Sequence, residues 1–457
     1  MIAFVVIVVL VGASTVWALF GGPAMGLPVA ELVLLAGLFL LFFGAGIYVA
    51  AALGLLGMLI GLMYSERPFW LFIGQTVWAP SSNYVLVAVP LFLLMGEILL
   101  RAGLSEKLYR ALNVWLARLP GGLLHTNIVS CAVFSAISGS SVATAATMGS
   151  VALPYFERTR YSTRMVLGSL AAGGALGNLI PPGITFIIYG LITETSGGTL
   201  YIAAVVPSLL VTLLFISVIL WHGLTGGRAE KPTALPLLQK LRSLVDLVPT
   251  TLLILLVLGS IYGGLATPTE AAALGVVGAA IFAMVEGRFS VRMLHESADA
   301  TARTTALIGL ILFGAYLLNF VLTSLRVPQA MAEIVAALPL PGWSIVALIL
   351  VFYLALGTFM EGFSMIITTV PIVFPIVVAL GYDPVWFGVV VTMMVEIALI
   401  SPPDGTVMYV LQGMRPSGGP ITDVFAGVMP FLGVYILAVA ILLAVPELAL
   451  WLPRVTD

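Results

Sequence analysis

Apolar runs about 20 residues long follow one another along most of the chain, separated by short polar segments. As helices, such runs match the roughly 30 Å hydrocarbon core of a bilayer. The apolar stretch from Leu27 to Tyr64 is too long for one crossing, and we divide it at Gly44-Ala45-Gly46. The pattern predicts eleven crossings, near residues 2–20, 28–44, 46–63, 85–100, 166–193, 200–221, 247–264, 269–286, 304–324, 384–411 and 424–449. The first crossing lacks the basic start of a signal peptide and has too long an apolar part, so we keep it as a membrane helix.

Two further apolar stretches have a polar centre and are predicted to be re-entrant hairpins. Residues 123–156 contain Ser138-Gly139-Ser140-Ser141 in their middle, which leaves two arms of about 15 residues, each about 22 Å long as helix and too short to cross. Residues 343–379 repeat the arrangement around Gly357-Thr358-Phe359-Met360-Glu361-Gly362. Exposed backbone at a hairpin tip is tolerated at membrane depth only where it is buried in protein or lines a wet cavity. The tips are therefore expected inside the protein.

Basic residues are distributed unevenly between the two faces of this map. With a cytoplasmic N-terminus, 15 of the 18 Lys and Arg residues fall on the cytoplasmic side, and the exceptions are Arg67, Arg326 and Arg454. Cytoplasmic loops of membrane proteins are enriched in Lys and Arg. The split therefore supports the map and predicts a periplasmic C-terminus.

Composition is typical of a protein with lipid as its solvent. Of the 457 residues, 61% are hydrophobic and 8% charged, whereas a soluble domain has about 25% charged residues. A net charge of −2 without a basic stripe excludes a nucleic-acid-binding function. The single Cys131 excludes a disulfide framework and any Cys-based zinc or iron–sulfur site. The three histidines, His125, His222 and His295, are too far apart in sequence to suggest a metal motif.

The chain contains an internal repeat at an offset of 221 residues. Ile180-Pro181-Pro182-Gly183-Ile184-Thr185 recurs as Ser401-Pro402-Pro403-Asp404-Gly405-Thr406, and Pro154 recurs as Pro375. Each proline pair removes backbone donors and is predicted to interrupt its helix. Five predicted crossings separate the hairpins, so the repeat should be inverted, an architecture typical of secondary transporters.

These motifs resemble the large membrane subunit, of the DctM type, of the tripartite ATP-independent periplasmic (TRAP) transporters. The matching strings are Ser138-Gly139-Ser140-Ser141-Val142-Ala143, Ile180-Pro181-Pro182, Thr267-Pro268-Thr269-Glu270-Ala271-Ala272-Ala273, Gly357-Thr358-Phe359 and Glu396-Ile397 leading into Pro402-Pro403. The resemblance covers roughly residues 30–453. It implies a bacterial inner-membrane protein that pairs with a small four-helix membrane subunit, receives an organic acid from a periplasmic binding protein and uses a sodium gradient. It also implies an elevator, in which a transport domain moves against a scaffold.

The expected fold is thus an all-α polytopic membrane protein, an inverted-repeat elevator-type transporter with two re-entrant hairpins and two broken helices. Its predicted parts are an extra membrane helix at 1–20, first-repeat scaffold helices and arm at 28–122, the first transport part at 123–193, linking and second-repeat scaffold helices and arm at 200–338, the second transport part at 343–411 and a last membrane helix at 424–449. Basic residues are interleaved with apolar ones over residues 101–118, and this pattern predicts an amphipathic arm along the cytoplasmic interface. A counterpart is predicted at 328–338. Thr267 to Glu270 predicts a capping box, which has no transport role.

Hairpin tips and helix breaks are the predicted functional segments, because their carbonyls lack helical partners and a hard cation prefers oxygen ligands. One sodium site is predicted from Ser138, Gly139, Ser140, Ser141 and Asn178 with carbonyls near Pro181, and the other from Gly357, Thr358, Glu361 and Gly362 with Ser401 and Gly405. Substrate is expected between the tips, near Thr144, Thr185, Asp404 and Thr406. Only the second site contains a carboxylate in this prediction. Sodium is the only expected metal, and no organic cofactor is expected.

Several carboxylates lie in apolar surroundings, where an ionised group is costly unless it is paired or coordinated. We interpret Glu361 as a cation ligand or its electrostatic support. Glu396 stays open between that role and a helix–helix hydrogen bond, and Asp404 between function and accepting from backbone donors at the break. Glu97 is interpreted as a scaffold contact. The Ser138 to Ser141 tip also fits a packing seam of small residues.

The sequence departs from the family at several positions. Residues 1–20 lie outside the usual core, Thr144 and Glu361 stand where many members have aspartate, and Asp404 replaces an apolar residue. The substrate therefore cannot be inherited from the family. One alternative function is a stand-alone divalent-anion/sodium symporter of similar inverted-repeat design. A remote one is an intramembrane serine hydrolase using Ser140 or Ser141, which would need a base within hydrogen-bond reach. An ion channel is disfavoured because neither a ring of charges nor a filter repeat occurs.

Overall fold

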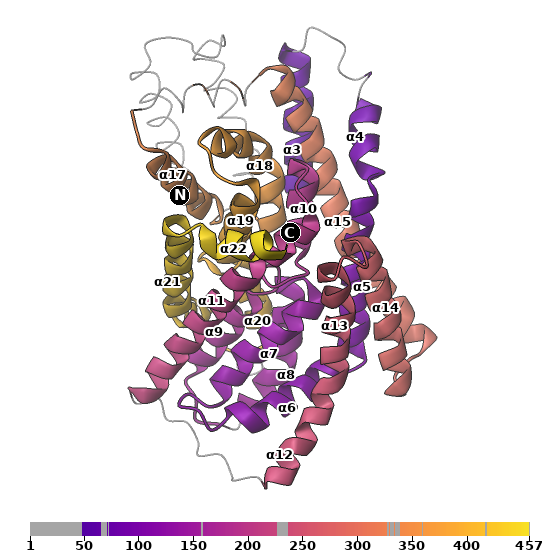
Figure 1. The fold of residues 1–457 in the computed structure, drawn as a ribbon, viewed down its shortest axis with the longest axis vertical. Helices are drawn as coiled ribbons and strands as arrows, with labels where there is room; N and C mark the ends of the chain where they lie inside the picture. The colour runs from indigo at the N-terminus through magenta and orange to yellow at the C-terminus, as the bar shows by residue number, and fades with distance from the viewer. Residues whose placement is uncertain are drawn as a thin grey trace. The chain divides into compact units, whose positions relative to one another are not determined.

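The computed structural model of the protein describes residues 48–64, 71, 73–156, 159–225, 236–326, 329, 333, 339–358, 360–415 and 418–456, and within these ranges every regular element is a helix (Figure 1). The elements are α3 (Val49–Tyr64), α4 (Ile73–Ser81), η2 (Tyr84–Val87), α5 (Ala88–Arg101), α6 (Leu104–Leu116), α7 (Leu123–Ser138), α8 (Ser141–Phe156), α9 (Thr163–Gly174), α10 (Ile184–Thr193), α11 (Gly197–Leu224), α12 (Leu237–Ser243), η3 (Leu244–Leu247), α13 (Val248–Tyr262), α14 (Pro268–Val285), α15 (Val291–Ser324), α17 (Gly342–Leu356), α18 (Gly362–Ala379), α19 (Pro384–Ile400), α20 (Thr406–Gly413), α21 (Thr422–Ala444) and α22 (Glu447–Thr456). The all-helical prediction is confirmed for this part of the chain.

Seven helices in the described ranges are long and apolar enough to cross a membrane. They are Tyr84–Arg101, Gly197–Leu224, Lys240–Tyr262, Pro268–Val285, Val291–Ser324, Gly362–Ala379 and Thr422–Ala444. Six of the seven coincide with predicted crossings, and α3, at 16 residues, is a shorter apolar helix at the crossing predicted for 46–63. The crossings predicted at 2–20 and 28–44, and most of the arm at 328–338, lie outside the described residues. The full count of eleven stays a prediction.

The two predicted broken helices are both interrupted, and each proline pair lies within its interruption. Helix α9 ends at Gly174 and α10 begins at Ile184, while α19 ends at Ile400 and α20 begins at Thr406. The peptide bonds Pro181–Pro182 and Pro402–Pro403 are both cis. Proline has no backbone N–H to continue a helical ladder, which accounts for the end of α19 just before Pro402. Helix α9 already ends at Gly174, before the chain reaches Pro181.

The repeat seen in the sequence is also present in the helix boundaries. Helices α8 and α18 begin at Ser141 and Gly362, which are 221 residues apart, and α9 and α19 begin at Thr163 and Pro384, at the same spacing. Each hairpin therefore precedes its broken helix in the same register. The inverted orientation of the halves stays a prediction.

Two helix boundaries and the length of one hairpin helix differ from the sequence-based expectation. The predicted crossing at 304–324 is the second part of a longer helix, because Ser290 caps it by accepting a hydrogen bond from the backbone N–H of Met293. The end of the crossing predicted at 424–449 is wrong, since α21 stops at Ala444 and α22 is a separate helix. Val445 leaves the helical region there, as expected of a residue before proline. Helix α18, at 18 residues, is long enough to cross, whereas its hairpin was predicted as re-entrant.

Internal packing divides the chain into two compact units. The first comprises the described residues within Met1–Asn83, Ala306–Ile349 and Phe363–Asp383, and the second those within Tyr84–Thr305, Leu350–Gly362 and Pro384–Asp457. In the first unit, α3 packs closely on the part of α15 from Ala306 onward. A Cβ on Gly57 would lie 2.9 Å from the backbone nitrogen of Leu318. In the second unit, α9 packs along α21, α7 and α8, and α14 packs along α5 (Figure 1). The predicted division into scaffold and transport parts stays a prediction.

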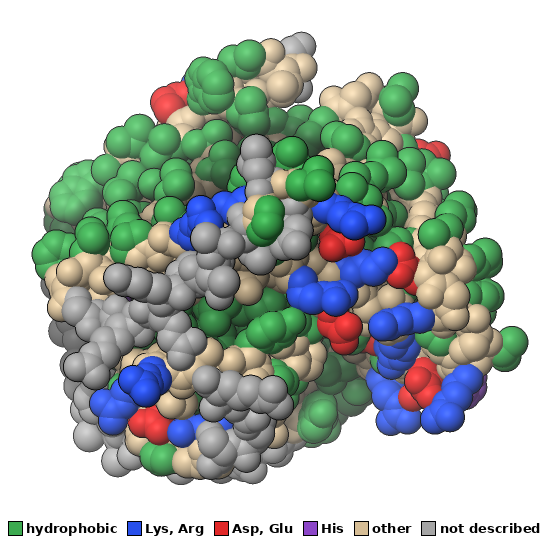
Figure 2. Space-filling model, turned by 90° about the horizontal axis from the view of Figure 1, so that it is seen from below, with side chains coloured by type: hydrophobic (Ala, Val, Ile, Leu, Met, Phe, Trp, Pro, Cys, Tyr) green, Lys and Arg blue, Asp and Glu red, His purple; other side chains and the backbone are tan. Residues whose placement is uncertain are grey.

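Local motifs in the second unit match their sequence signals. Thr267 and Glu270 form the predicted capping box at the start of α14. Helix α6 lies within the predicted arm and buries Leu104 and Leu108 on its apolar side. Lys and Arg side chains gather with Asp and Glu side chains on the face that Figure 2 shows. Among the ion pairs of this unit, Lys107 Nζ lies 2.6 Å from Glu286 Oε2.

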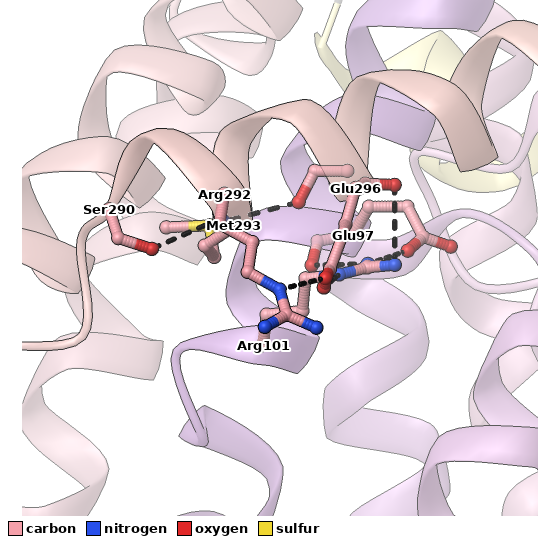
Figure 3. A network of polar contacts seen from close by, with 7 residues as sticks. Glu97, Arg101, Ser290, Arg292, Met293 and Glu296 are labelled. Carbon is pink, nitrogen blue, oxygen red and sulfur yellow. Dashed lines mark hydrogen bonds and ion pairs between the residues drawn. The ribbon is translucent and has the colours of Figure 1, made fainter.

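Glu97, predicted to be a scaffold contact, belongs to an ion-pair network between α5 and the start of α15 (Figure 3). It pairs with Arg101 on the next turn of its own helix, and Arg101 Nε lies 3.7 Å from Glu296 Oε2. Glu296 in turn accepts from Arg292 at 2.8 Å. The charge of Glu97 is thus neutralised by a neighbouring guanidinium, which is a structural role.

The contact between α9 and α21 depends on glycine. A Cβ on Gly427 would lie 1.9 Å from the carbonyl oxygen of Arg164, and one on Gly168 would lie 2.0 Å from the carbonyl oxygen of Gly427. Backbone atoms cannot yield as a flexible side chain can, so even a methyl group must separate the two helices. Small residues at such crossings let membrane helices approach closely.

We therefore expect Gly427→Ala to destabilise the protein by about 1–3 kcal/mol, the usual cost of overpacking. The matched control is Gly433→Ala on the same helix, where the new Cβ would meet no atom within 4 Å. Apparent melting temperatures of the purified variants in detergent measure the difference. Equal melting temperatures for the two variants would show that the helix contact is looser than described.

Candidate functional site

The first hairpin tip closes against the first helix break. Between α7 and α8, Gly139 adopts a left-handed conformation at φ +60°, and a Cβ there would lie 2.6 Å from the carbonyl oxygen of Pro182. The carbonyl of Gly139 accepts a hydrogen bond from the backbone N–H of Ile184 at 3.2 Å. The tip therefore needs glycine for its backbone conformation and for its close approach to the break.

Polar side chains of the tip contact one another and the segment that follows α9. The hydroxyls of Ser138 and Thr144 are hydrogen-bonded at 2.7 Å. Asn178 donates to Ser141 Oγ twice, from its backbone N–H and from Nδ2, each at 3.0 Å. A Cβ on Gly177 would lie 2.3 Å from Ser141 Cα, so the break and the tip are in direct backbone contact. The structure thus brings together five of the residues predicted for the first half: Ser138, Gly139, Ser141, Asn178 and Thr144.

A carboxylate from the second repeat completes this cluster. Glu396, in α19, accepts hydrogen bonds from the Ser141 hydroxyl at 2.8 Å on Oε1 and 2.7 Å on Oε2. The backbone N–H of Asn178 donates to Glu396 Oε1 at 3.2 Å. Glu396 is 0% exposed. Packing therefore places a carboxylate beside the residues predicted for the first site, where the sequence-based prediction has none.

Sequence reasoning left the role of Glu396 open and did not place it in either site. The available signal was a carboxylate in an apolar helix shortly before a proline pair, which indicates that a polar partner exists. Nothing in the sequence identified that partner, since Ser141 is 255 residues away.

Unpartnered acceptors lie beside these hydrogen bonds. The side-chain oxygens of Asn178 and Thr185 are buried and have no hydrogen-bond partner among the residues that the structure describes. Thr185 follows Ile184, whose N–H contacts the tip. Buried polar atoms normally find partners, so these oxygens remain able to accept a donor or to contact a cation. A carboxylate, an amide oxygen and hydroxyls together are a donor set that fits a hard cation.

The second hairpin tip is packed against α19. A Cβ on Gly357 would lie 2.6 Å from Ala398 Cβ, and one on Gly362 would lie 2.5 Å from a methyl group of Val395. The Thr358 hydroxyl donates to the carbonyl of Ala355 at 2.7 Å. The tip is therefore fixed on the helix that ends at the second break.

Other residues predicted for the second half lie at that break or at the tip. The N–H of Gly405 donates to the carbonyl of Ser401 at 3.1 Å, and Gly405 is buried. Glu361 and Thr406 are half-buried, and Asp404 is exposed. In the first half, Ser140 is half-buried and Pro181 is in the cis pair. The assignment of these residues to sodium or substrate stays a prediction.

The hydrolase alternative needs a base near the serines of the first tip. His125 lies in the first turn of α7, at the opposite end of that helix from the tip, and its Nε2 is 2.7 Å from the carbonyl oxygen of Pro120. The hydroxyl of Ser141 is directed to Glu396 instead. The histidine–serine arrangement that this alternative would use is not formed with His125.

Comparisons with known proteins agree with the motifs. The model of the family "Tripartite ATP-independent periplasmic transporter, DctM component" matches residues 16–448. The C4-dicarboxylate TRAP transporter large permease protein DctM of Pseudomonas aeruginosa is 34% identical over 411 residues, which cover 88% of this chain and 94% of that protein. The sialic acid TRAP transporter large permease protein SiaM of Vibrio cholerae is 28% identical over 384 residues, covering 84% of this chain and 89% of that protein.

Among solved structures, the YdaH transporter of Alcanivorax borkumensis has a similar fold. Its TM-score is 0.62 at 18% sequence identity, over 89% of this chain and 98% of that one. At this identity the likeness concerns the fold alone, which is that of a membrane transporter. The family match over nearly the whole chain, the relatives at 28% and 34% identity and the apolar helices together lead to one conclusion. The chain is a multi-pass membrane protein that belongs to the DctM component family of the tripartite ATP-independent periplasmic transporters.

Proposed function

We propose that this chain is the translocating large subunit of a sodium-coupled uptake system for a small organic acid in the bacterial inner membrane. In this proposal it works with a periplasmic binding protein and a small four-helix membrane subunit, by an elevator movement. Family membership supports the transport role and the partners. The observation that carries the cation coupling is the buried oxygen cluster of Ser141, Asn178 and Glu396, which joins a hairpin tip to a helix break.

The helix breaks support an anionic substrate. Helices α10 and α20 begin shortly after the proline pairs, at Ile184 and Thr406, and neither has a side-chain cap. In α10 the Ile184 N–H already donates to the carbonyl of Gly139. The helix dipole at each N-terminus, with any first-turn N–H groups that remain, favours a carboxylate. Two of the relatives are named for C4-dicarboxylate and sialic acid, which are both carboxylic acids. We therefore propose an organic acid bound near Thr144, Thr185 and Thr406, with Asp404 at the edge of the site.

A stand-alone divalent-anion symporter is the second candidate, since its design also contains inverted repeats and broken helices. The symporter would transport substrate without a binding protein or a small membrane subunit.

The substrate can be identified most directly through the binding protein. Thermal-shift screening of organic acids against that soluble partner would identify which acid the system accepts.

The proposed second sodium site predicts a specific effect of Glu361. We expect Glu361→Gln to raise the half-saturating sodium concentration for uptake about tenfold, because a contact to a charged group contributes about 1.5–3 kcal/mol. Sodium titrations of uptake in proteoliposomes that contain the full system measure this. The matched control is Glu447→Gln, which removes a carboxylate that forms an exposed ion pair with Arg454. An unchanged sodium dependence in Glu361→Gln would assign the residue a structural role and would contradict the proposed second sodium site.

A further inference from the structure

Glu396 reaches from the second repeat of the chain to the hairpin tip of the first. The repeat offset pairs its position with Ala175, so the first repeat has no equivalent carboxylate. Helix α19 holds Glu396 rigidly, because residues 386 to 400 of this helix are all buried. The cluster at the first tip is therefore built from both halves of the chain.

The hydrogen bonds of Ser141 with Glu396 and Asn178 fix the direction in which its hydroxyl hydrogen points. A serine hydroxyl has one hydrogen and two lone pairs. The hydrogen is directed to the Glu396 carboxylate, and the lone pairs face the backbone N–H and the Nδ2 of Asn178, each at 3.0 Å. Asn178 Oδ1 is left without a donor although Asn178 is only 3% exposed. The side chain that positions Ser141 thus presents an unused oxygen in the same buried cluster.

The charge of Glu396 is also without a protein counter-charge. Ser141 and Asn178, its hydrogen-bond partners, are neutral, and the ion pairs among the described residues do not include it. A buried carboxylate needs an opposing charge or a dense set of donors to remain ionised. A cation beside Asn178 Oδ1 would supply that charge and also satisfy the free oxygen.

We propose that Glu396 is a positioning residue for cation binding at the first hairpin tip. It fixes Ser141 and Asn178 across the repeat and supplies the negative charge that opposes the ion. This inference rests on the proposed sodium-coupled function. Its consequence is that loading of the first site depends on α19, a helix of the second half. The first and second halves are then coupled through one side chain.

The test compares Glu396→Gln with Thr392→Val. The first variant keeps the shape and one acceptor oxygen but removes the charge, and the second changes a buried side chain one helical turn earlier on α19. Sodium is titrated at constant ionic strength against potassium, with two readouts: the apparent melting temperature of the purified chain and the uptake rate of the full system in proteoliposomes. We expect Glu396→Gln to raise the half-saturating sodium concentration about tenfold or more in both readouts, with much of the maximal rate recovered at high sodium, because each 1.4 kcal/mol is a factor of about ten. Thr392→Val should titrate like the wild type.

Three results would overturn the inference or its basis. A wild-type sodium dependence in Glu396→Gln would make Glu396 a simple hydrogen-bond acceptor between helices. If that variant does not yield folded protein, Ser141→Ala tests the same arrangement from the other side, and an unchanged sodium titration there contradicts the proposal. A wild-type protein that responds equally to sodium and potassium in both readouts would refute the sodium-coupled function itself.

Discussion

Uptake by the purified chain alone should be absent, and it should appear only when a binding protein, a small membrane subunit and an inward sodium gradient are all supplied. The expected effect is a complete loss, because in the proposed system substrate arrives on a soluble protein and the uphill step draws on sodium. The measurement is the uptake of labelled organic acid from the external solution into proteoliposomes. These contain the chain either with or without its partners. Replacing the sodium gradient by a potassium gradient should have the same effect as omitting a partner.

Each failure of this expectation has a distinct meaning. Full uptake by the chain without partners would favour the stand-alone symporter, whose substrate reaches the tips from solution. Uptake that persists with potassium would contradict the sodium coupling while leaving the family assignment intact, since that assignment follows from the match over residues 16–448. A binding protein with its ligand site blocked is the control for non-specific stimulation by added protein.

Gly177→Ala should reduce the transport rate about five- to 150-fold. At this position a Cβ would lie 2.3 Å from Ser141 Cα, 2.4 Å from Ser141 N and 2.5 Å from the carbonyl carbon of Ser140. All three are backbone atoms, so the first hairpin tip must move away from the helix break. The displacement separates Ser141 from Asn178 and Glu396, whose hydrogen bonds depend on this contact. We expect an overpacking cost of about 1–3 kcal/mol, which corresponds to a loss of about five- to 150-fold.

Gly413→Ala provides the matched control for this substitution. Gly413 ends α20, and a Cβ there would meet no atom within 4 Å. Its uptake rate should equal that of the wild type, while the apparent melting temperature of Gly177→Ala shows whether the lost transport reflects the tip or the whole fold. Wild-type transport by Gly177→Ala would mean that the tip and the break are not held together during the cycle.

Sequence alone was sufficient for features whose cause is local. The pair at 402–403 ends α19 because proline has no N–H, and the pair at 181–182 lies in the interruption between α9 and α10, as predicted. The capping box at Thr267 and the second arm of the first hairpin, α8, which begins at Ser141, were also predictable from local sequence signals. The helices that coincide with predicted crossings follow from length and apolarity, since lipid requires a continuous apolar helix. Family membership rests on the same local strings.

Boundaries were less reliable where local signals compete. The predicted crossing at 424–449 merged α21 with α22, because both are apolar enough to continue the pattern through Val445 and Pro446. Helix α15 extends back to Val291 through a more polar segment that hydropathy alone does not include. The start of α15 depends on the cap by Ser290, and the end of α21 depends on Val445 preceding a proline. Each of these signals involves only a few residues, so the hydropathy of a long segment does not reveal it.

Which polar groups contact one another depends on how distant helices pack. Glu396 and Ser141 are 255 residues apart, and no periodicity or motif pairs them. Gly168 and Gly427, in α9 and α21, likewise contact each other across more than half of the chain. In an apolar helix a carboxylate or a glycine indicates that a partner is needed, because burial of an unpaired charge is costly and close packing requires small residues. The identity of that partner depends on which helices pack together, and this is fixed by the shapes of many distant side chains at once rather than by any short segment of sequence.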